Sequence, residues 1–227
     1  MIRHHPSADR LTAFSAGSLP LSQALCIRVH LEHCRQCRDE VERMNQIGAL
    51  LLNYLPPAPV SDSLKAQVLA SIDAGEVQEA PAAGAGTAPP AVNSSDLPRC
   101  LQAWIPEGFD KLGWKRVSPS IQAVKLCNDV NGSKVELLKI RRGGKVAPHN
   151  HTGEEITLVL EGSFSDSQGV YGKGDIIFRN RDDKHHRPIA SQDADCICLT
   201  AVEAPIQFTG FFGRLFNPFI RRSHYAC

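Results

Sequence analysis

The sequence predicts an α + β chain of two domains, an N-terminal unit of four helices and a C-terminal β-barrel. Residues 1–75 carry apolar side chains at helical spacing, whereas residues 98–227 contain short apolar runs separated by Gly, Asn or Asp. Between them, residues 76–97 are rich in Ala, Gly and Pro and offer few large apolar side chains to bury. This composition predicts a flexible linker between the two domains.

Capping residues and breakers divide the N-terminal unit into four helices. Ser7 is expected to cap the first helix, which ends near Gly17. Pro20 opens the second, LSQALCIRVHLEH, because proline suits the first turn of a helix. The third runs from about Gln36 to Leu55, and the fourth follows Ser61. A helical core this small often needs an additional cross-link.

The C-terminal half contains short strand-like runs at a spacing typical of a barrel or sandwich. Gly, Asn or Asp residues separate the runs. The predicted strands are KVELLKI (134–140), EITLVLEGSF (155–164), GDIIFRN (174–180), RPIAS (187–191) and DCICLTAVEA (195–204).

Charge and hydropathy exclude two classes of main partner. The formal net charge is +1, and no acidic or basic block suggests nucleic acid or a membrane surface. No apolar run is long enough to span a bilayer, and MIRHHPSADR has neither an apolar signal core nor a cleavage site. We therefore expect a cytoplasmic protein, in which paired cysteines are more often metal ligands or redox thiols than disulfides.

The stretch HLEHCRQC contains the first candidate metal site, with His30, Cys34 and Cys37 in the pattern H-x-x-x-C-x-x-C. The three side chains share one face if the region is a continuous helix, and they still converge if Cys34 lies in a turn between two helices. Two thiolates and an imidazole suit zinc. The obvious source of a fourth ligand is the pair His4-His5. A redox role for the C-x-x-C pair is the less favoured alternative.

The stretch GGKVAPHNHTGEEITLVLEG contains the second candidate site and resembles the first motif of cupins. His149 and His151 face the same side of a strand, and Glu155 begins the next strand after a short turn. The fourth ligand is expected from GDIIFRNRDDKHHRP, as either His185 or His186. We favour His186, since the pattern H-x-P then ends at Pro188. Zinc, Fe(II), Mn and Ni all suit three imidazoles and one carboxylate.

Two further observations complete the candidate sites. Glu154, next to Glu155, is expected to be a solvated neighbour and not a ligand. Cys196 and Cys198 share one face of a strand, where they are either barrel core or redox-responsive thiols.

The combination of both motifs in one chain resembles the ChrR family of anti-sigma factors. In that family a zinc-binding anti-sigma domain, joined to a cupin, inhibits an extracytoplasmic-function sigma factor. The resemblance implies that singlet oxygen or organic peroxide, sensed through the cupin, releases the sigma factor. It also implies two sets of ligands: His5, His30, Cys34 and Cys37 for a structural zinc, and His149, His151, Glu155 and His186 for the cupin metal.

Two rival interpretations are weaker. A cupin enzyme, such as a dioxygenase or isomerase with a zinc-stapled interaction domain, would need a substrate pocket and an open metal position. A DNA-binding regulator would need a clustered basic recognition helix, which the helical half lacks. We therefore expect a protein that is not an enzyme and that contacts no nucleic acid directly.

Overall fold

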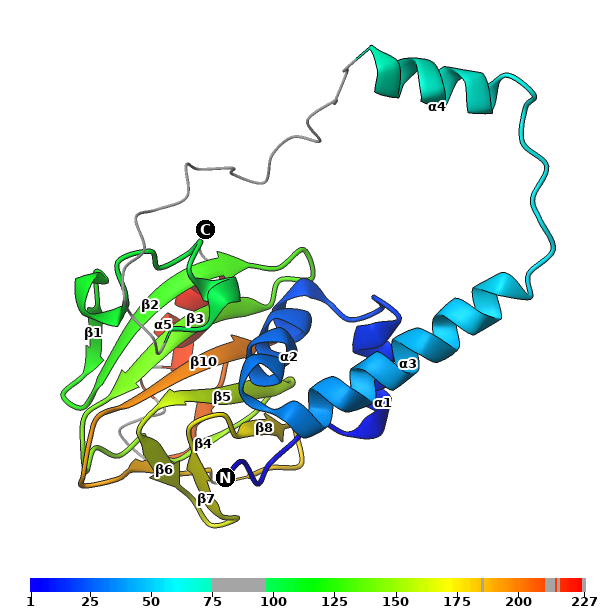
Figure 1. Cartoon of the computed structure of the whole chain (residues 1–227). Helices are drawn as coiled ribbons and strands as arrows, with labels where there is room; N and C mark the ends of the chain where they lie inside the picture. The colour runs from blue at the N-terminus through cyan, green and yellow to red at the C-terminus, as the bar shows by residue number, and fades with distance from the viewer. Residues whose placement is uncertain (75–96, 185, 211–214, 216, 226–227) are drawn as a thin grey trace.

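The computed structural model describes residues 1–74, 97–184, 186–210, 215 and 217–225. It confirms the predicted combination of N-terminal helices with a C-terminal β fold (Figure 1). The predicted linker, residues 76–97, falls almost entirely outside the described residues. The four N-terminal helices are α1 (Ala8–Ser15), α2 (Leu21–His33), α3 (Arg35–Asn53) and α4 (Leu64–Asp73).

The helices begin and end close to the predicted positions. The Ser7 side chain accepts a hydrogen bond from the Arg10 backbone N–H and so caps α1. Gly17 follows α1 with a φ of 66°, a backbone conformation that favours glycine. Cys34 is the only residue between α2 and α3, and its extended backbone (φ −110°, ψ 105°) separates the two helices.

The four helices do not share one core. Helices α1, α2 and α3 contribute Leu11, Cys26 and Val41 to a buried cluster, whereas α4 has no buried residue. Only the N-terminal part of α3 is buried, and its C-terminal part projects from the body of the molecule (Figure 1). None of the described helices is long and apolar enough to cross a membrane.

The C-terminal half is built on a six-stranded antiparallel sheet in the order β1-β2-β3-β10-β5-β8. β11 pairs with β4, and β6 lies between β7 and β9. All five predicted runs contain observed strands, and β4 contains His149 of the strand expected at the second candidate site, whereas no predicted run covers β1, β2, β7 or β11. The strands are β1 (Lys115–Ser118), β2 (Ile121–Asn128), β3 (Lys134–Ile140), β4 (His149–Asn150), β5 (Glu155–Glu161), β6 (Ser163–Ser165), β7 (Val170–Gly172), β8 (Ile176–Arg179), β9 (Ile189–Ala190), β10 (Cys196–Val202) and β11 (Gln207–Phe208).

Short helices flank this β fold. Two 3-10 turns, η1 (Arg99–Leu101) and η2 (Phe109–Lys111), precede β1, and helix α5 (Asn217–Tyr225) follows β11. The η1 turn is tied to α2, because the Glu32 side chain accepts hydrogen bonds from the backbone N–H groups of Arg99 (2.7 Å) and Cys100 (3.1 Å).

Helix α2 packs directly on the large sheet, so the helices and the β fold share one hydrophobic core (Figure 1). One buried cluster contains Ile27 and Leu31 of α2 together with Ile156, Leu158 and Leu199 of the sheet. Strand β10 is buried along its whole length, since α2 covers one of its faces and the interior of the β fold covers the other.

Candidate metal centres

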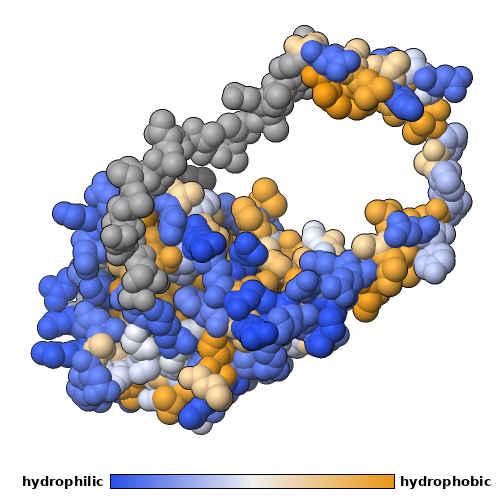
Figure 2. All heavy atoms as spheres, viewed as in Figure 1, coloured by the Kyte–Doolittle hydropathy of each residue, from blue (hydrophilic) through white to orange (hydrophobic). Residues whose placement is uncertain are grey.

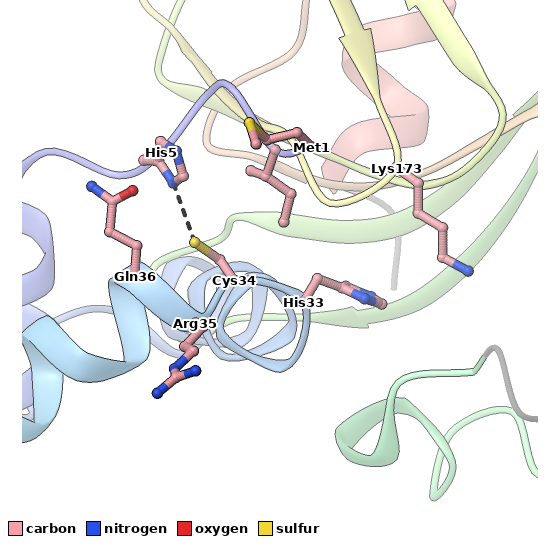
Figure 3. Close-up of a pocket in the computed structure, with 8 residues that line it drawn as sticks. Met1, His5, His33, Cys34, Arg35, Gln36 and Lys173 are labelled. Atoms are coloured by element: carbon pink, nitrogen blue, oxygen red, sulfur yellow. Dashed lines mark hydrogen bonds between the residues drawn. The ribbon is translucent and has the colours of Figure 1, made fainter.

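The first candidate site is assembled as the sequence predicts. His5, His30, Cys34 and Cys37 each offer one ligand atom, and these four atoms lie within 4.8 Å of one another. His30 Nε2 lies 3.3 Å from Cys37 Sγ, and His5 Nδ1 lies 3.3 Å from Cys34 Sγ and 3.4 Å from Cys37 Sγ. Figure 3 shows His5 pointing toward Cys34. This set of two nitrogens and two sulfurs suits a closed tetrahedral zinc site.

The break between α2 and α3 brings these side chains together. His30 lies in the last turn of α2, Cys34 lies at the break, and Cys37 lies in the first turn of α3. His5 comes from the segment that precedes α1. The sequence allowed either one continuous helix or a turn at Cys34, and the structure has Cys34 between two helices.

Protonation at the first cluster also fits a metal. Burial lowers the pKa of His30 to about 4, so at neutral pH its ring is neutral and keeps a lone pair for a ligand bond. Burial, together with Cys34, raises the pKa of Cys37 to about 12. The surrounding protein therefore does not stabilise the thiolate, and a bound cation would supply the charge that does.

The second candidate site gathers three histidines inside the β fold. His149, His151 and His186 offer ligand atoms within 4.8 Å of one another, and all three are buried. His186 pairs with His149 through two backbone hydrogen bonds of 3.1 and 3.0 Å. Its Nδ1 lies 3.4 Å from His151 Nε2. The structure thus brings the favoured residue, His186, into the cluster, and His185 lies outside the described residues.

Glu155 lies at the edge of this cluster, with Oε2 3.3 Å from His151 Nδ1. Burial alone would raise the pKa of Glu155, but the contact with His151 and the nearby histidines lower it to about 2. Burial, helped by His149, lowers the pKa of His186 to about 4. His151 Nδ1 and His186 Nε2 are buried, and each lies within 3.5 Å of a carboxylate oxygen, that of Glu155 or of Asp166, without forming a well-aligned hydrogen bond. Neutral imidazoles and an ionised carboxylate are what a divalent cation would need.

A second layer of residues supports His186. Its Nε2 lies 3.5 Å from Asp166 Oδ2, and Arg179 donates to the same oxygen at 2.9 Å. Arg179 also donates to the Tyr171 hydroxyl at 2.8 Å. Sequence reasoning missed this chain of contacts, because Asp166 lies in the turn-like stretch SDSQG and no ligand spacing marks it.

A comparison with curated proteins identifies the family. The chain is 32% identical over 221 residues to the anti-sigma-E factor ChrR of Cereibacter sphaeroides, and the match covers 97% of this chain and 99% of that protein. This chain belongs to the ChrR family. Its residues 107–205 match the family described as the ChrR cupin-like domain.

A solved structure supports the same relationship. The chain resembles the crystal structure of Rhodobacter sphaeroides SigE in complex with the anti-sigma ChrR, with a TM-score of 0.75 and 28% sequence identity. The similarity covers 89% of this chain and 99% of that chain. The ChrR relationship therefore extends over the helical half as well as the cupin half.

Glu154 was expected to be a solvated neighbour of Glu155, but in this ChrR-family chain it contacts the helices. Its carboxylate forms an ion pair with Arg10 of α1 and accepts a hydrogen bond from Gln23 of α2 at 2.8 Å. Adjacent strand residues point to opposite faces, so Glu155 faces the histidines while Glu154 faces the helices. The peptide that enters β5 thus contacts both halves of the molecule.

Replacing Glu154 with alanine is expected to loosen the helices from the cupin. The change removes a partly buried ion pair and leaves Gln23 without its acceptor, which should lower the free energy of unfolding by about 1–3 kcal/mol. Chemical denaturation would measure this loss, and hydrogen exchange of the α1 amides would locate it. The control is Glu40→Ala, which removes an exposed pair with Arg43 and should cost about 0.5 kcal/mol or less. Equal effects from the two variants would contradict the assignment of Glu154 to the interface.

Cys196 and Cys198 lie in the interior of the cupin and are both buried. Their sulfurs are 3.6 Å apart. The contact with Cys196 and burial raise the pKa of Cys198 well above its ordinary value, which keeps this thiol protonated and weakly nucleophilic. Of the two roles left open by the sequence, these observations favour packing in the barrel core.

Proposed function

We propose that this chain is a cytoplasmic anti-sigma factor that binds and inhibits an extracytoplasmic-function sigma factor and releases it after an oxidative signal. The similarity to a ChrR in complex with SigE supports a sigma factor as the partner. In this proposal residues 1–75 form the sigma-binding domain, residues 76–97 the linker and residues 98–227 the cupin sensor. The chain catalyses no reaction, and it contacts neither nucleic acid nor membrane directly.

The observation that carries the proposal is an exposed apolar surface on two helices. Figure 2 shows hydrophobic residues along α4 and at the end of α3. On α3 these side chains follow each other at intervals of three and four, so they form one stripe. The apolar residues of this surface, each at least 41% exposed, are Ile47, Leu50, Leu51, Tyr54 and Leu55 at and beyond the end of α3, and Leu64, Val68, Leu69 and Ile72 on α4.

This surface has the character of a protein-binding site. Contiguous exposed apolar patches on soluble proteins commonly mark interaction surfaces. An amphipathic helix buries its apolar face against a partner, and no described residue of this chain covers the face of α4. We propose that the sigma factor binds the apolar faces of α3 and α4. Both faces lie on the part of the helical half that does not pack on the cupin.

The test of the binding function is capture from the native host, with the full-length chain as bait and mass spectrometry as the readout. Recovery of one sigma factor, lost when the chain is treated with a zinc chelator, is the expected result. Absence of any sigma factor in both conditions would overturn the anti-sigma assignment. Steady oxygen consumption by the purified chain with some substrate would instead favour a cupin enzyme.

The two clusters have different roles in the proposal. His5, His30, Cys34 and Cys37 would hold a structural zinc that joins the segment before α1 to the junction of α2 and α3. His149, His151, Glu155 and His186 would hold zinc or another divalent metal such as Fe, Mn or Ni. A metal at the second cluster would supply a centre at which singlet oxygen or organic peroxide acts. A change at that cluster could reach the helices through Glu154, which is next to Glu155 in the chain and contacts Arg10 of α1.

The His149→Ala variant separates sensing from binding. Loss of one imidazole is expected to empty the second cluster while the exposed faces of α3 and α4 stay intact. The variant should therefore inhibit the sigma factor as well as the wild type does, but induction of a sigma-dependent reporter by singlet oxygen should be lost. Metal analysis of the purified variant provides the control for occupancy. Normal induction from a variant that lacks the second metal would overturn the sensing role.

A further inference from the structure

A turn of the cupin lies against the first metal cluster. This turn, residues 172–176, joins β7 to β8. The Gly174 carbonyl accepts a hydrogen bond of 2.8 Å from His30 Nδ1, and His30 is fully buried. Because a carbonyl oxygen only accepts, the Nδ1 atom carries the proton and Nε2 is left with its lone pair. Nε2 is the atom that lies 3.3 Å from Cys37 Sγ, so this contact sets the tautomer that a metal requires.

The same turn holds the segment that carries His5. Asp175 Oδ1 accepts hydrogen bonds from the backbone N–H groups of Arg3 (2.7 Å) and His4 (2.9 Å). The Ile176 N–H donates to the His4 carbonyl at 3.3 Å. The other oxygen, Asp175 Oδ2, accepts from the Gly172 N–H at 2.8 Å and so keeps the carboxylate aligned. The backbone directly before His5 is therefore fixed by the cupin and not by the helices.

The close fit of the turn depends on Gly174. Its φ of +89° is unfavourable for residues with a side chain. A Cβ at this position would lie 2.7 Å from Ile2 Cδ1 and 3.2 Å from His33 Cβ. The turn thus touches both the N-terminal segment and the end of α2, the two elements that supply the histidine ligands.

We infer that the turn at Gly174 and Asp175 is a positioning element for the first metal site, so that the helical half holds its zinc tightly only while the cupin is docked. Outer contacts that orient metal ligands commonly change metal affinity by 10- to 100-fold when they are removed. The inference goes beyond the proposed function, but it rests on the assignment of zinc to His5, His30, Cys34 and Cys37.

The coupling also acts in the opposite direction. If docking strengthens zinc binding, zinc must strengthen docking by the same factor. The cluster is open to solvent on one side, where a shallow pocket of about 490 Å³ is lined by His5, Cys34 and Lys173 among others (Figure 3). A chelator can approach the metal from this side, which makes the rate of metal release a practical measure of how firmly His5 is held.

The test uses the full-length chain loaded with Co²⁺. A cobalt–thiolate absorption band arises only where cobalt binds cysteine, so it measures occupancy of the first cluster and not of the second. Asp175→Ala is expected to speed the loss of this band to a chelator by roughly 10-fold. The matched control is Asp129→Ala. Asp129 is also a cupin carboxylate that accepts a backbone N–H of the helical half, at 2.7 Å, but the donor is Ser22 at the start of α2. The control should change the release rate by less than the factor of about ten expected for Asp175→Ala.

Circular dichroism and metal content would reveal whether Asp175→Ala disturbs the cupin itself. A second variant tests the inference if it does. Arg3→Pro removes one of the donors to Asp175 and leaves every cupin residue in place. It should also speed release. If Asp175→Ala is folded and loses its metal at the wild-type rate, the inference is overturned. If Asp175→Ala is misfolded, a wild-type rate of metal release from Arg3→Pro overturns it instead. Absence of the cobalt–thiolate band in the wild type would show instead that the zinc assignment is wrong.

Discussion

Replacing Leu51 with aspartate is expected to weaken sigma-factor binding by roughly 30-fold or more, because central interface residues contribute about 2 kcal/mol or more. Leu51 is 64% exposed and lies on the apolar stripe of α3. The change would place an unpaired charge in the interface at no cost to the core of the free protein. Leu69→Asp makes the same change on α4, where Leu69 is 50% exposed. Titration calorimetry with the purified sigma factor would measure both losses.

The control for this prediction is Asn53→Asp, which adds the same charge two residues further along α3. Asn53 is exposed and lies about 200° around the helix from Leu51. Its substitution should change the affinity by less than about 0.5 kcal/mol, as expected for a surface position away from the interface. Wild-type affinity in both Leu51→Asp and Leu69→Asp would show that the sigma factor binds elsewhere.

Replacing Cys37 with alanine is expected to have the largest effect on the folded protein, through loss of the first metal. Structural zinc sites contribute roughly 10 kcal/mol or more of binding free energy in small domains. Without zinc, the segment before α1 and the junction of α2 and α3 lose their cross-link. We expect the variant to lack one equivalent of zinc, to unfold at a lower temperature and to bind the sigma factor far more weakly.

The matched control is Cys127→Ala, which removes a half-buried thiol on β2, outside both clusters. It should keep the full zinc content and the wild-type affinity for the sigma factor. A Cys37→Ala variant that retains one zinc in each cluster would rule out Cys37 as a ligand. A variant that loses zinc but keeps its affinity would show that the exposed faces of α3 and α4 bind without the cross-link.

The sequence was sufficient for features that depend on local spacing. The spacing of His30, Cys34 and Cys37 predicts one cluster whether or not the helix is continuous, and the structure brings these residues together. The choice of His186 rested on the H-x-P pattern, and its backbone pairing with His149 explains why it lies in the cluster. Strand β2 was missed, since its residues are only partly buried and alternate less regularly than those of β3.

Contacts between the two halves could not be predicted from local spacing. Nothing near Asp175 or Glu154 indicates that their partners lie more than 100 residues away in the chain. One clue was present in α2, where the buried residues Ser22, Cys26, Ile27, Val29 and His30 span about 160° of the helix circumference. A helix buried over so wide an arc needs more than one neighbour, and the second neighbour of α2 is the cupin sheet.

The shared core beneath α2 has a consequence for the making and removal of this protein in the cell. A cupin produced without the helices would expose Ile156, Leu158 and Leu199, each of which is almost fully buried in the intact chain. Leaving each such side chain in water costs roughly 1.5–3 kcal/mol. A cupin separated from the helices would thus be a substrate for chaperones and proteases instead of a lasting fragment. Cutting the chain and removing the helices would therefore be a one-way event, and recovery would require newly synthesised protein.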